Sequence, residues 1–487
     1  VAAGTSAAAK ARRNDESSEI KIYEKDSHIS YSACGTPYYI GGSVESIESL
    51  TPRNAAFFKS KHNVDVFIRH EVLSVNPTEK IISVKNLDDG NTFTKNYDKL
   101  IIATGAKSII PPIDGIDKNN VFSLRNITSA VIIKNYINAN NVKSALIVGS
   151  GFIGMELAEN FSSTGIETTI VEMKEHLSPK MDSDVSVYIE DYISKKGISF
   201  LTGDSVTRFS GGEKAEYAEL KSGKKVSAEI FIIAAGVKPE ITLASSAGIE
   251  IGTTGAIKVN KKMQTNFGDI YACGDCAESY SVITGKPIYH PLGSTANKTG
   301  RIAGDQASGG QLEFRGILGT GIFKLFDMTI AQTGLTENEA RAEGYDCEVV
   351  HNIKPDKPEY AGGKEMMIKA VADRKTQRLL GIQIVGYEGV DKRIDVFATA
   401  ITFGAKVTDL FHLDLAYAPP FSTTKDPVMY TGMILDNAIN GKRKLITPAG
   451  LKETASNGKI QIIDSRVSSQ YDKAHVEGAE NIPHEKL

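Results

Sequence analysis

The sequence has no tryptophan and little cysteine, with four cysteines in 487 residues. So few cysteines in so long a chain exclude the disulfide framework of a small secreted protein and indicate a cytoplasmic setting. The formal net charge is only −3, there is no long basic run, and no apolar run reaches the ~18 residues needed to span a bilayer. We therefore expect neither a nucleic-acid partner nor a membrane.

Glycine, in contrast, is frequent, with 44 residues. Many glycines are typical of α/β proteins that bring their backbone close to nucleotides. The length corresponds to about three domains of ~150 residues, each able to bury a core.

Residues 144–172 contain a dinucleotide-binding fingerprint. An apolar run, ALIV, is followed by GSGFIG, a helical stretch and a second apolar run. Gly149 permits the tight turn, Gly151 lets the backbone approach a pyrophosphate, and Gly154 allows the helix to pack closely on the strand. The sequence therefore predicts a nicotinamide-nucleotide domain here.

An acid at the end of the second strand influences which nucleotide such a domain prefers. Here it is Glu172, which is placed to accept hydrogen bonds from the ribose hydroxyls and would repel a 2′-phosphate. This favours NADH, while the nearby Lys174 is compatible with NADPH.

A second unit of the same kind opens the chain. Residues 1–24 contain Gly4 as the last glycine of a fingerprint, an alanine-rich helix, and a strand that ends in Glu24, followed by Lys25. On this interpretation, the first strand and the leading glycines would precede Val1. Two dinucleotide folds in one chain indicate FAD beside a nicotinamide nucleotide.

Three further segments fit an FAD-binding domain that the nicotinamide domain interrupts. KLIIATGAKSIIPP and EIFIIAAGVKPE are typical of crossover segments, and DIYACGDCAES is suited to a phosphate or ribityl chain. The residues of these segments that we expect at a cofactor are Thr104, Gly105, Gly236, Gly274 and Asp275.

From about residue 315 the pattern changes to two strands around a polar turn, followed by helical stretches over 393–413 and 428–441. The predicted fold class is α/β, with two Rossmann-like dinucleotide-binding domains, an α+β dimerisation domain and a short C-terminal α/β segment. The predicted boundaries are 1–108 and 229–314 for the FAD-binding domain, 109–228 for the NAD-binding domain, 315–443 for the dimerisation domain and 444–487 for the last segment.

The segment SYSACGTPYYIGG distinguishes Cys34 from the other cysteines. Its thiol could be a buried small hydrophobe, half of a disulfide, a metal ligand or a nucleophile. Pro37 predicts that a helix begins beside it, and the free N–H groups of a helix start favour a thiolate. Cys273 and Cys276 have redox or zinc spacing, but no second C-x-x-C accompanies them. We therefore predict an inert pair and no metal site.

The same segment resembles the S-F/Y-x-x-C-G-x-P-Y signature of the single-cysteine flavoprotein disulfide reductases. These include coenzyme A-disulfide reductases, NADH oxidases, NADH peroxidases and persulfide reductases. ATG, GSGFIGMELAE, AAGVKPE, YACGDCAE and LAYAPPFSTTKD follow in the matching order, so the resemblance covers residues 1 to about 440. It implies FAD, a nicotinamide nucleotide, and a homodimer in which the partner subunit completes the active site.

Within this family the coenzyme A-disulfide reductases fit best, because Lys10 and Arg13 are spaced i, i+3 on one face of the first helix, which by similarity would meet coenzyme A phosphates. Ala2 stands where the peroxidases carry an acid/base histidine, which argues against peroxide chemistry. The resemblance implies a catalytic thiol at Cys34, proton-donating tyrosines at Tyr417 and Tyr360, and Asn297 beside the flavin. The residues that it implies for coenzyme A are Ser6, Lys10, Arg13, Ser30 and Lys425. The alternative for the basic side chains of the first helix is a solvated face.

Residues 459–487 resemble the opening of a rhodanese domain, with D-x-R, a tyrosine and H-x-x-G-A-x-x-I-P in order. The sulfur-carrying cysteine of such a domain would be expected after Leu487. A fusion of this kind in the family accompanies the reduction of coenzyme A persulfide or polysulfide.

The resulting hypothesis is that NAD(P)H reduces coenzyme A disulfide, coenzyme A persulfide or polysulfide through a mixed disulfide on Cys34. One alternative is an NADH oxidase that cycles Cys34 through a sulfenate. Another, from a different class, is a flavoprotein electron-transfer or sensor module in which Cys34 only packs.

Overall fold

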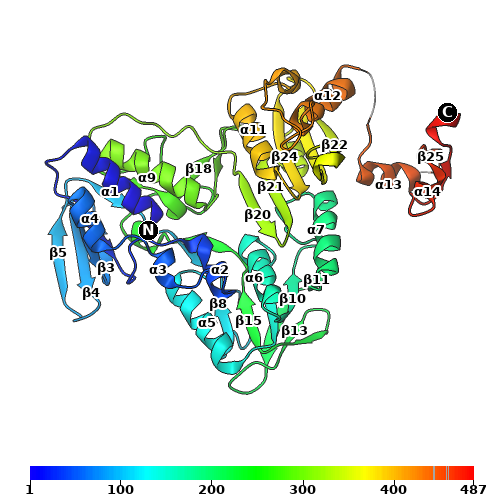
Figure 1. The fold of residues 1–487 in the computed structure, drawn as a ribbon. Coiled ribbons are helices and arrows are strands. Elements are labelled where there is room, and N and C mark those ends of the chain that lie inside the picture. The colour runs from blue at the N-terminus through cyan, green and yellow to red at the C-terminus, as the bar shows by residue number, and fades with distance from the viewer. Residues whose placement is uncertain (442–444, 457, 459) are drawn as a thin grey trace.

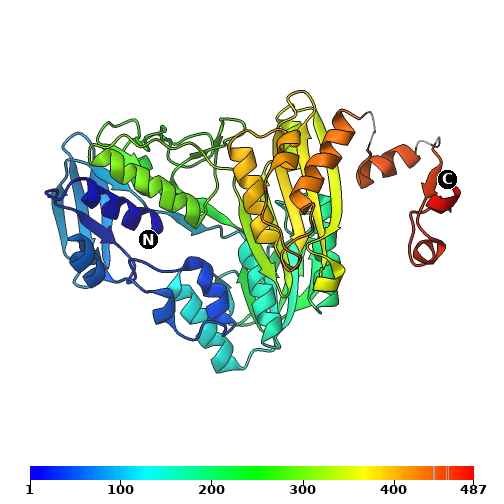
Figure 2. The same cartoon turned by 45° about the horizontal axis from the view of Figure 1, so that its top comes forward.

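The computed structural model describes residues 1–441, 445–456, 458 and 460–487. Three units of mixed helices and strands are followed by a small C-terminal segment, so the predicted α/β class is confirmed (Figure 1, Figure 2). In this described part of the chain, no helix is both long and apolar enough to cross a membrane.

The first unit is held together by two helices, α1 and α9, that lie side by side (Figure 2). A Cβ on Gly300 or Gly304 of α9 would stand only 2.3 Å or 2.1 Å from the carbonyl oxygens of Ala3 and Ala7 on α1. Glycine therefore lets the helix backbones touch. The unit comprises α1 (Ala2–Asn14), β1 (Lys21–Glu24), α2 (Thr36–Ile40), α3 (Ile47–Leu50), α4 (Ala55–His62), β2 (Asp65–Ile68), β3 (His70–Asn76), β4 (Ile81–Asn86), β5 (Thr92–Asn96), β6 (Leu100–Ile102), β7 (Ala106–Ser108), β16 (Val237–Pro239), α8 (Thr242–Ser246), β17 (Ile270–Ala272), β18 (Ser279–Tyr280), β19 (Pro287–Ile288) and α9 (Gly293–Ala307).

Two 3-10 turns in this unit carry residues of interest, η1 (Ala33–Gly35) and η2 (Gly274–Cys276). In the described part of the chain, the expected Rossmann sheet is represented by the parallel pairs β1–β2 and β6–β17. Strands β3, β4 and β5 form an antiparallel meander. β7 pairs antiparallel with β16, so the two segments that lead into and out of the second unit run side by side.

The second unit is a parallel sheet in the order β11-β10-β9-β15-β8, flanked by helices and a small antiparallel sheet. β15 pairs with both β9 and β8, so it is an interior strand of this sheet. The boundary predicted at residue 229 is therefore wrong, because it assigns this strand to the first unit. The elements are β8 (Val121–Ser123), α5 (Ile127–Asn140), β9 (Ser144–Val148), α6 (Phe152–Ser163), β10 (Glu167–Glu172), α7 (Ser183–Lys195), β11 (Ser199–Thr202), β12 (Val206–Ser210), β13 (Tyr217–Leu220), β14 (Lys225–Ser227) and β15 (Ile230–Ile233).

The third unit is an antiparallel sheet in the order β20-β21-β24-β23-β22, as the two-strand pattern predicts. The helix predicted over 393–413 is interrupted: α11 ends at Thr402, and Gly404 has a φ of +75°. The elements are β20 (Gly321–Leu325), β21 (Met328–Gly334), α10 (Glu337–Ala342), β22 (Cys347–Pro355), η3 (Glu359–Ala361), β23 (Glu365–Asp373), β24 (Leu379–Gly386), α11 (Val390–Thr402), η4 (Val407–His412) and α12 (Pro427–Ile439).

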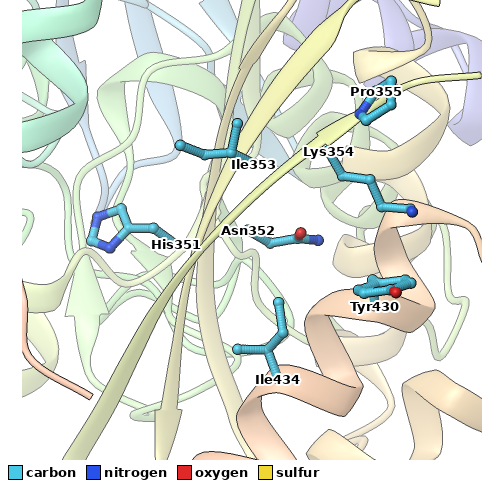
Figure 3. A pocket seen from close by; sticks show the side chains of 7 residues that line it. All are labelled: His351, Asn352, Ile353, Lys354, Pro355, Tyr430 and Ile434. Atoms are coloured by element: carbon cyan, nitrogen blue, oxygen red, sulfur yellow. The ribbon is translucent and has the colours of Figure 1, made fainter. Parts of the chain in front are cut away.

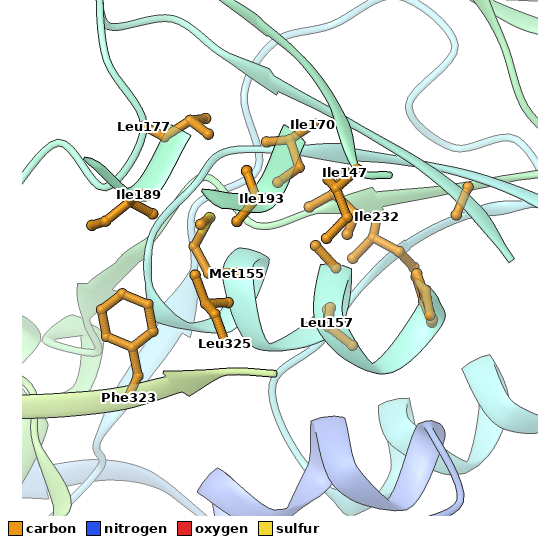
Figure 4. Packing of buried hydrophobic residues seen from close by; sticks show 14 of the residues in the cluster. Ile147, Met155, Leu157, Ile170, Leu177, Ile189, Ile193, Ile232, Phe323 and Leu325 are labelled. Atoms are coloured by element: carbon orange, nitrogen blue, oxygen red, sulfur yellow. The ribbon is translucent and has the colours of Figure 1, made fainter. Parts of the chain in front are cut away.

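The second and third units share one hydrophobic core. Phe323 and Leu325 of β20 pack with Met155 of α6 and Ile189 and Ile193 of α7 (Figure 4). All but Phe323 are at most 1% exposed, and Phe323 is 6% exposed. Because apolar burial of this kind is the main stabilising force between packed elements, the third unit holds the second in place.

A buried charge cluster lies at the same junction. Lys369 of β23 is 2% exposed, and its ammonium group lies 3.2 Å from Asp182, 2.9 Å from Asp184 and 2.9 Å from Glu337. His351 of β22 lies 2.7 Å from Asp184 as well. Three carboxylates around one buried cation fix the register between the start of α7 and the third unit's sheet.

The C-terminal segment contains α13 (Pro448–Ser456), β25 (Ile462–Asp464), α14 (Ser468–Tyr471) and β26 (Ala479–Asn481). β25 and β26 pair in parallel, and the Arg466 guanidinium donates to Asp464. The predicted boundary between 443 and 444 lies outside the described residues.

Candidate functional site

Cys34 lies on η1, directly before α2, and its side chain is exposed. Pro37 occupies the first turn of α2, as predicted. The protein atoms packed around the thiol, together with the carboxylates of Glu156 and Asp275, raise its pKa, and α2 has only 5 residues. Stabilisation of a thiolate by this helix start stays a prediction. The thiol is therefore accessible, but its surroundings oppose its ionisation.

Two glutamates of α6 lie behind the Cys34 segment. A Cβ on Gly41, just after α2, would stand 2.3 Å from the side-chain oxygen of Asn160, so the end of α2 packs directly on α6. Burial and the neighbouring Glu159 raise the pKa of Glu156 to about 7. Glu156 can therefore hold or release a proton close to neutral pH in the vicinity of Cys34.

The glycines of the nicotinamide fingerprint have the geometry that their roles require. Gly149 has a φ of +104°, and a Cβ there would lie 2.5 Å from the carbonyl oxygen of Ala234. A Cβ on Gly154 would lie 2.1 Å from the carbonyl oxygen of Gly149. At Gly151 nothing lies within 4 Å of a Cβ, which leaves open space at the N-terminus of α6 for a phosphate.

Glu172 is 4% exposed and is fixed by donors from two turns. One carboxylate oxygen accepts hydrogen bonds from the N–H (2.9 Å) and the hydroxyl (2.7 Å) of Ser150. The other accepts from the N–H of Lys174 at 2.9 Å. The acid thus ties the fingerprint turn to the end of β10, where the fold places a ribose.

The candidate flavin site lies where α1, η2 and the ATG segment meet. Gly274 has a φ of +76°, and a Cβ on it would stand 2.7 Å from that of Ala3. A Cβ on Gly4 would touch that of Ala103 at 3.4 Å. The segment 274–276 is a 3-10 turn. Burial raises the pKa of Asp275, even though its carboxylate lies 3.5 Å from Arg125.

The other predicted cofactor residues lie around this meeting point or on the crossover segments. The Thr104 hydroxyl donates to the carbonyl of Glu240 at 2.6 Å, and Gly105 and Gly236 both have positive φ. Glu24 ends β1, and the exposed Lys25 next to it lies 4.0 Å from Glu71.

Lys10 and Arg13 of α1, which we expect to meet coenzyme A phosphates, have different surroundings in the structure. Lys10 is directed to α9, where its ammonium lies 2.9 Å from Asp305, and Ser6 donates to Asn297 at 2.7 Å. Arg13 is exposed, and within the described residues no carboxylate pairs with it. In this structure a buried acid of α9 therefore pairs with Lys10 and leaves Arg13 as the exposed cation, and the joint role of Lys10 and Arg13 at coenzyme A stays a prediction.

The structure adds basic residues to Arg13 that the sequence did not indicate. Burial and the nearby positive charges of Arg13, Lys61 and Arg53 lower the pKa of His62, so these side chains gather at one place. Ser30 forms a β-bridge with Arg53, which connects this cluster to the segment that carries Cys34. We call Arg13, Arg53 and Lys61 the basic patch. Only folding reveals it, because α4 and α1 are far apart in the sequence.

The two predicted tyrosines lie on exposed loops of the third unit. Tyr360 of η3 is 81% exposed, and Tyr417, between η4 and α12, is 48% exposed. Lys425 lies on the same loop as Tyr417 and is exposed. Both tyrosine side chains are thus accessible from outside the chain.

The remaining cysteines are buried and free. Cys273 and Cys276 are both 0% exposed, and burial raises the pKa of each thiol. Cys347 is the first residue of β22. In the described part of the chain, no three His, Cys, Asp or Glu side chains are grouped to hold a metal.

A hollow of about 550 Å³ lies on the third unit, between β22 and α12, and contains none of the predicted site residues (Figure 3). Figure 3 shows Asn352 and Lys354 directed toward Tyr430 of α12, while His351 points to the opposite face of the strand. Asn352 donates to the carbonyl of Pro427 at 3.0 Å, so this face of β22 holds the start of α12.

Two family models match the chain. One, pyridine nucleotide-disulphide oxidoreductase, covers residues 2–296, and the dimerisation domain of the same family covers residues 321–427. The chain belongs to this family of oxidoreductases, whose members use FAD and NAD(P)H.

The curated relatives include enzymes that act on coenzyme A-linked sulfur. The chain is 37% identical to an NAD(P)H sulfur oxidoreductase (CoA-dependent) of Pyrococcus furiosus, over 89% of this chain and 97% of that one. It is 32% identical to a coenzyme A disulfide reductase of Staphylococcus haemolyticus, over 89% and 97%. It is also 35% identical to an NADH oxidase of Methanocaldococcus jannaschii, over 88% and 95%.

Among solved structures, the fold is similar to reduced Bacillus anthracis CoADR-RHD, with a TM-score of 0.97 and 35% identity. That likeness covers 100% of this chain and 87% of the other. It includes the C-terminal segment.

Proposed function

We propose that this enzyme uses NAD(P)H to reduce coenzyme A disulfide, or the persulfide or polysulfide of coenzyme A, through a mixed disulfide on Cys34. The observation that carries the proposal is the position of this exposed thiol, on a segment that Ser30 connects to the basic patch. A thiol that meets the sulfur of the substrate and cations that meet its phosphates are the two features that coenzyme A requires. Two of the relatives are named for coenzyme A chemistry.

The reaction proceeds in two balanced steps. The Cys34 thiolate attacks one sulfur of coenzyme A disulfide, the old S–S bond breaks, and a Cys34–coenzyme A disulfide forms. The departing coenzyme A thiolate takes a proton from Tyr417 or Tyr360. Two electrons and one proton then convert the mixed disulfide into the Cys34 thiolate and a second coenzyme A thiol.

The residues present fit both cofactors. The space at Gly151 and the fixed carboxylate of Glu172 suit NAD(P)H, and the close contacts of Gly274 and Gly4 form a small-residue cradle suited to FAD. When bound, FAD passes the electron pair of NAD(P)H to the mixed disulfide. The chain itself holds the acid Glu172 toward the ribose, which favours NADH over NADPH.

The active site requires two subunits in this proposal. The tyrosines are exposed on the unit that matches the family's dimerisation domain, so a homodimer would bring Tyr417 and Tyr360 of one chain to Cys34 of the other. Reduced thiols and NADH are found together in the cytoplasm, which suits four free cysteines. The C-terminal segment would be the start of a rhodanese domain, in agreement with its likeness to CoADR-RHD.

The proposal is tested by following NADH oxidation with coenzyme A disulfide, coenzyme A persulfide, polysulfide or oxygen as the only acceptor. We expect kcat/KM to be highest for one of the sulfur substrates and the Cys34→Ser variant to lose that activity. An enzyme that consumes oxygen faster than it reduces any of them is instead an NADH oxidase that cycles Cys34 through a sulfenate.

A further inference from the structure

One buried cation in the third unit reaches both tyrosine loops. Arg393 of α11 is 1% exposed and is among the largest fully buried side chains in the described part of the chain. Its guanidinium donates to groups on three different segments. The acceptors are the Asp426 carboxylate (2.9 Å), the Ser422 hydroxyl (3.2 Å), the carbonyl of Asp356 (2.8 Å) and the carbonyl of Gly389 (3.2 Å).

The first of these segments is the loop that carries Tyr417. Its last residue, Asp426, is the N-cap of α12, and its carboxylate accepts from the N–H of Val428 at 2.9 Å and from Ser422 at 2.7 Å. α12 is in turn fixed to β22 through Asn352 (Figure 3). Arg393 and Asp426 therefore join the exposed loop to the start of α12.

The second segment is the loop that carries Tyr360. Its ends are paired: the N–H of Asp356 donates to the carbonyl of Lys364 at 2.9 Å, and the N–H of Lys364 donates to the Asp356 carboxylate at 2.7 Å. Arg393 donates to the carbonyl at one of these ends. Since the Tyr360 ring itself is 81% exposed, the base of its loop sets where the ring stands.

A buried ion pair of this kind adds little stability compared with well-packed apolar residues, because both charges lose their hydration. Its distinctive property is geometric: a guanidinium presents several N–H donors in one rigid plane. Here that plane contacts two loops that are separated in sequence by β23, β24, α11 and η4. Arg393 thus joins the base of the Tyr360 loop to the end of the Tyr417 loop.

We propose that Arg393 is a positioning residue that holds Tyr417 and Tyr360 together at the place where a proton is delivered to the departing thiolate. This inference rests on the proposed function, in which those two tyrosines are the proton donors. It adds a residue that touches neither substrate nor cofactor.

The test uses the FAD-loaded full chain and separates the two halves of the reaction. In Arg393→Lys, we expect kcat for coenzyme A disulfide to fall by roughly tenfold, because a displaced proton donor is costly. The single-turnover rate at which NADH reduces the enzyme should stay unchanged. Arg374→Lys is the matched control, since Arg374 is a half-exposed arginine of the same unit that pairs with Glu348.

A double-mutant cycle distinguishes positioning from a general loss of stability. Ser422→Ala removes one contact of Arg393 with less risk to folding than a change at Arg393 itself, and should lower kcat in the wild-type background. In the Tyr417→Phe background, it should lower kcat no further, because the two changes act through one group.

The positioning role would be wrong if the losses of kcat in Ser422→Ala and Tyr417→Phe multiply in the double variant, or if Arg393→Lys keeps full activity. Either result would leave the proposed function intact. Full turnover in the double variant Tyr417→Phe/Tyr360→Phe would remove the tyrosines from the mechanism and with them the positioning role of Arg393, while the reduction through Cys34 would stand. Substantial turnover in Cys34→Ser would overturn the proposed function itself.

Discussion

Cys34 differs from the pair Cys273–Cys276 both in the spacing of cysteines in the sequence and in the exposure of the thiol in the structure. The pair has the spacing of a redox or zinc motif, yet both side chains are 0% exposed. Cys34 has no cysteine neighbour, yet it lies exposed on a short turn. Because a thiol must meet its substrate to react, accessibility rather than spacing identifies the reactive cysteine.

Among the substitutions that test this difference between the cysteines, removal of the Cys34 thiol should have the largest effect on turnover. Cys34→Ser should lower coenzyme A disulfide turnover by about 10³-fold or more, because no other group can form the mixed disulfide. The FAD content of the purified variant, read from its visible absorbance, should equal that of the wild type. Substantial turnover in this variant would show that Cys34 only packs.

The next effect concerns Tyr417, one of the two proposed proton donors. Tyr417→Phe should lower kcat by about 10²-fold, since a positioned general acid contributes that much. Tyr430→Phe is the matched control, because Tyr430 lies on α12 of the same unit and packs under Lys354. Equal losses in the two variants would indicate damage to the unit rather than a lost proton.

The basic patch should affect binding rather than chemistry. Arg13→Ala should raise KM for coenzyme A disulfide by about tenfold with kcat little changed, as expected when one charged hydrogen bond is lost. Lys10→Ala should have a smaller effect, because Asp305 already neutralises that ammonium. A larger increase in KM in Lys10→Ala than in Arg13→Ala would indicate that Lys10 is the main cation that binds the substrate.

A smaller, pH-dependent effect is expected from Glu156. Its raised pKa, about 7, means that it gains negative charge as pH rises through neutrality, and this charge then raises the pKa of Cys34. Glu156→Gln removes that charge, so the pH profile of Cys34 alkylation by iodoacetamide should move to lower pH. A profile that stays in place, or moves to higher pH, would mean that Glu156 does not act on the thiol.

The smallest effect should come from the buried pair. Cys276→Ala should leave turnover within about twofold of wild type while lowering the free energy of unfolding by about 1 kcal/mol, as is common for a truncated core side chain. Thermal unfolding and steady-state kinetics measure the two quantities. A large loss of turnover at unchanged stability would give the C-x-x-C pair a redox role after all.

The sequence was sufficient to predict structural features that are formed within a single continuous segment. Gly149 and Gly154 have the strained or crowded geometry that their spacing predicts, Gly151 faces open space, and Pro37 lies in the first turn of α2. The sequence was less informative where distant segments meet. Asp305 neutralises Lys10, the glutamate and aspartate near Cys34 raise its pKa, and β15 joins a sheet on the other side of the predicted boundary.

The basic patch and Arg393 could not be predicted for the same reason. Arg53 and Lys61 belong to a segment with no recognisable motif, and only the packing of α4 near the end of α1 brings them to Arg13. The guanidinium of Arg393 is indistinguishable in sequence from a surface arginine until its loop acceptors surround it.

The central claim is that Cys34 carries coenzyme A as a mixed disulfide, and intact-protein mass spectrometry tests it most directly. The reduced, FAD-loaded enzyme is incubated with coenzyme A disulfide in the absence of NADH, and the adduct is located by peptide mapping. We predict one coenzyme A moiety per chain, on Cys34, that NADH releases as a thiol. No adduct, an adduct on another cysteine, or only an added oxygen on Cys34 would contradict the claim.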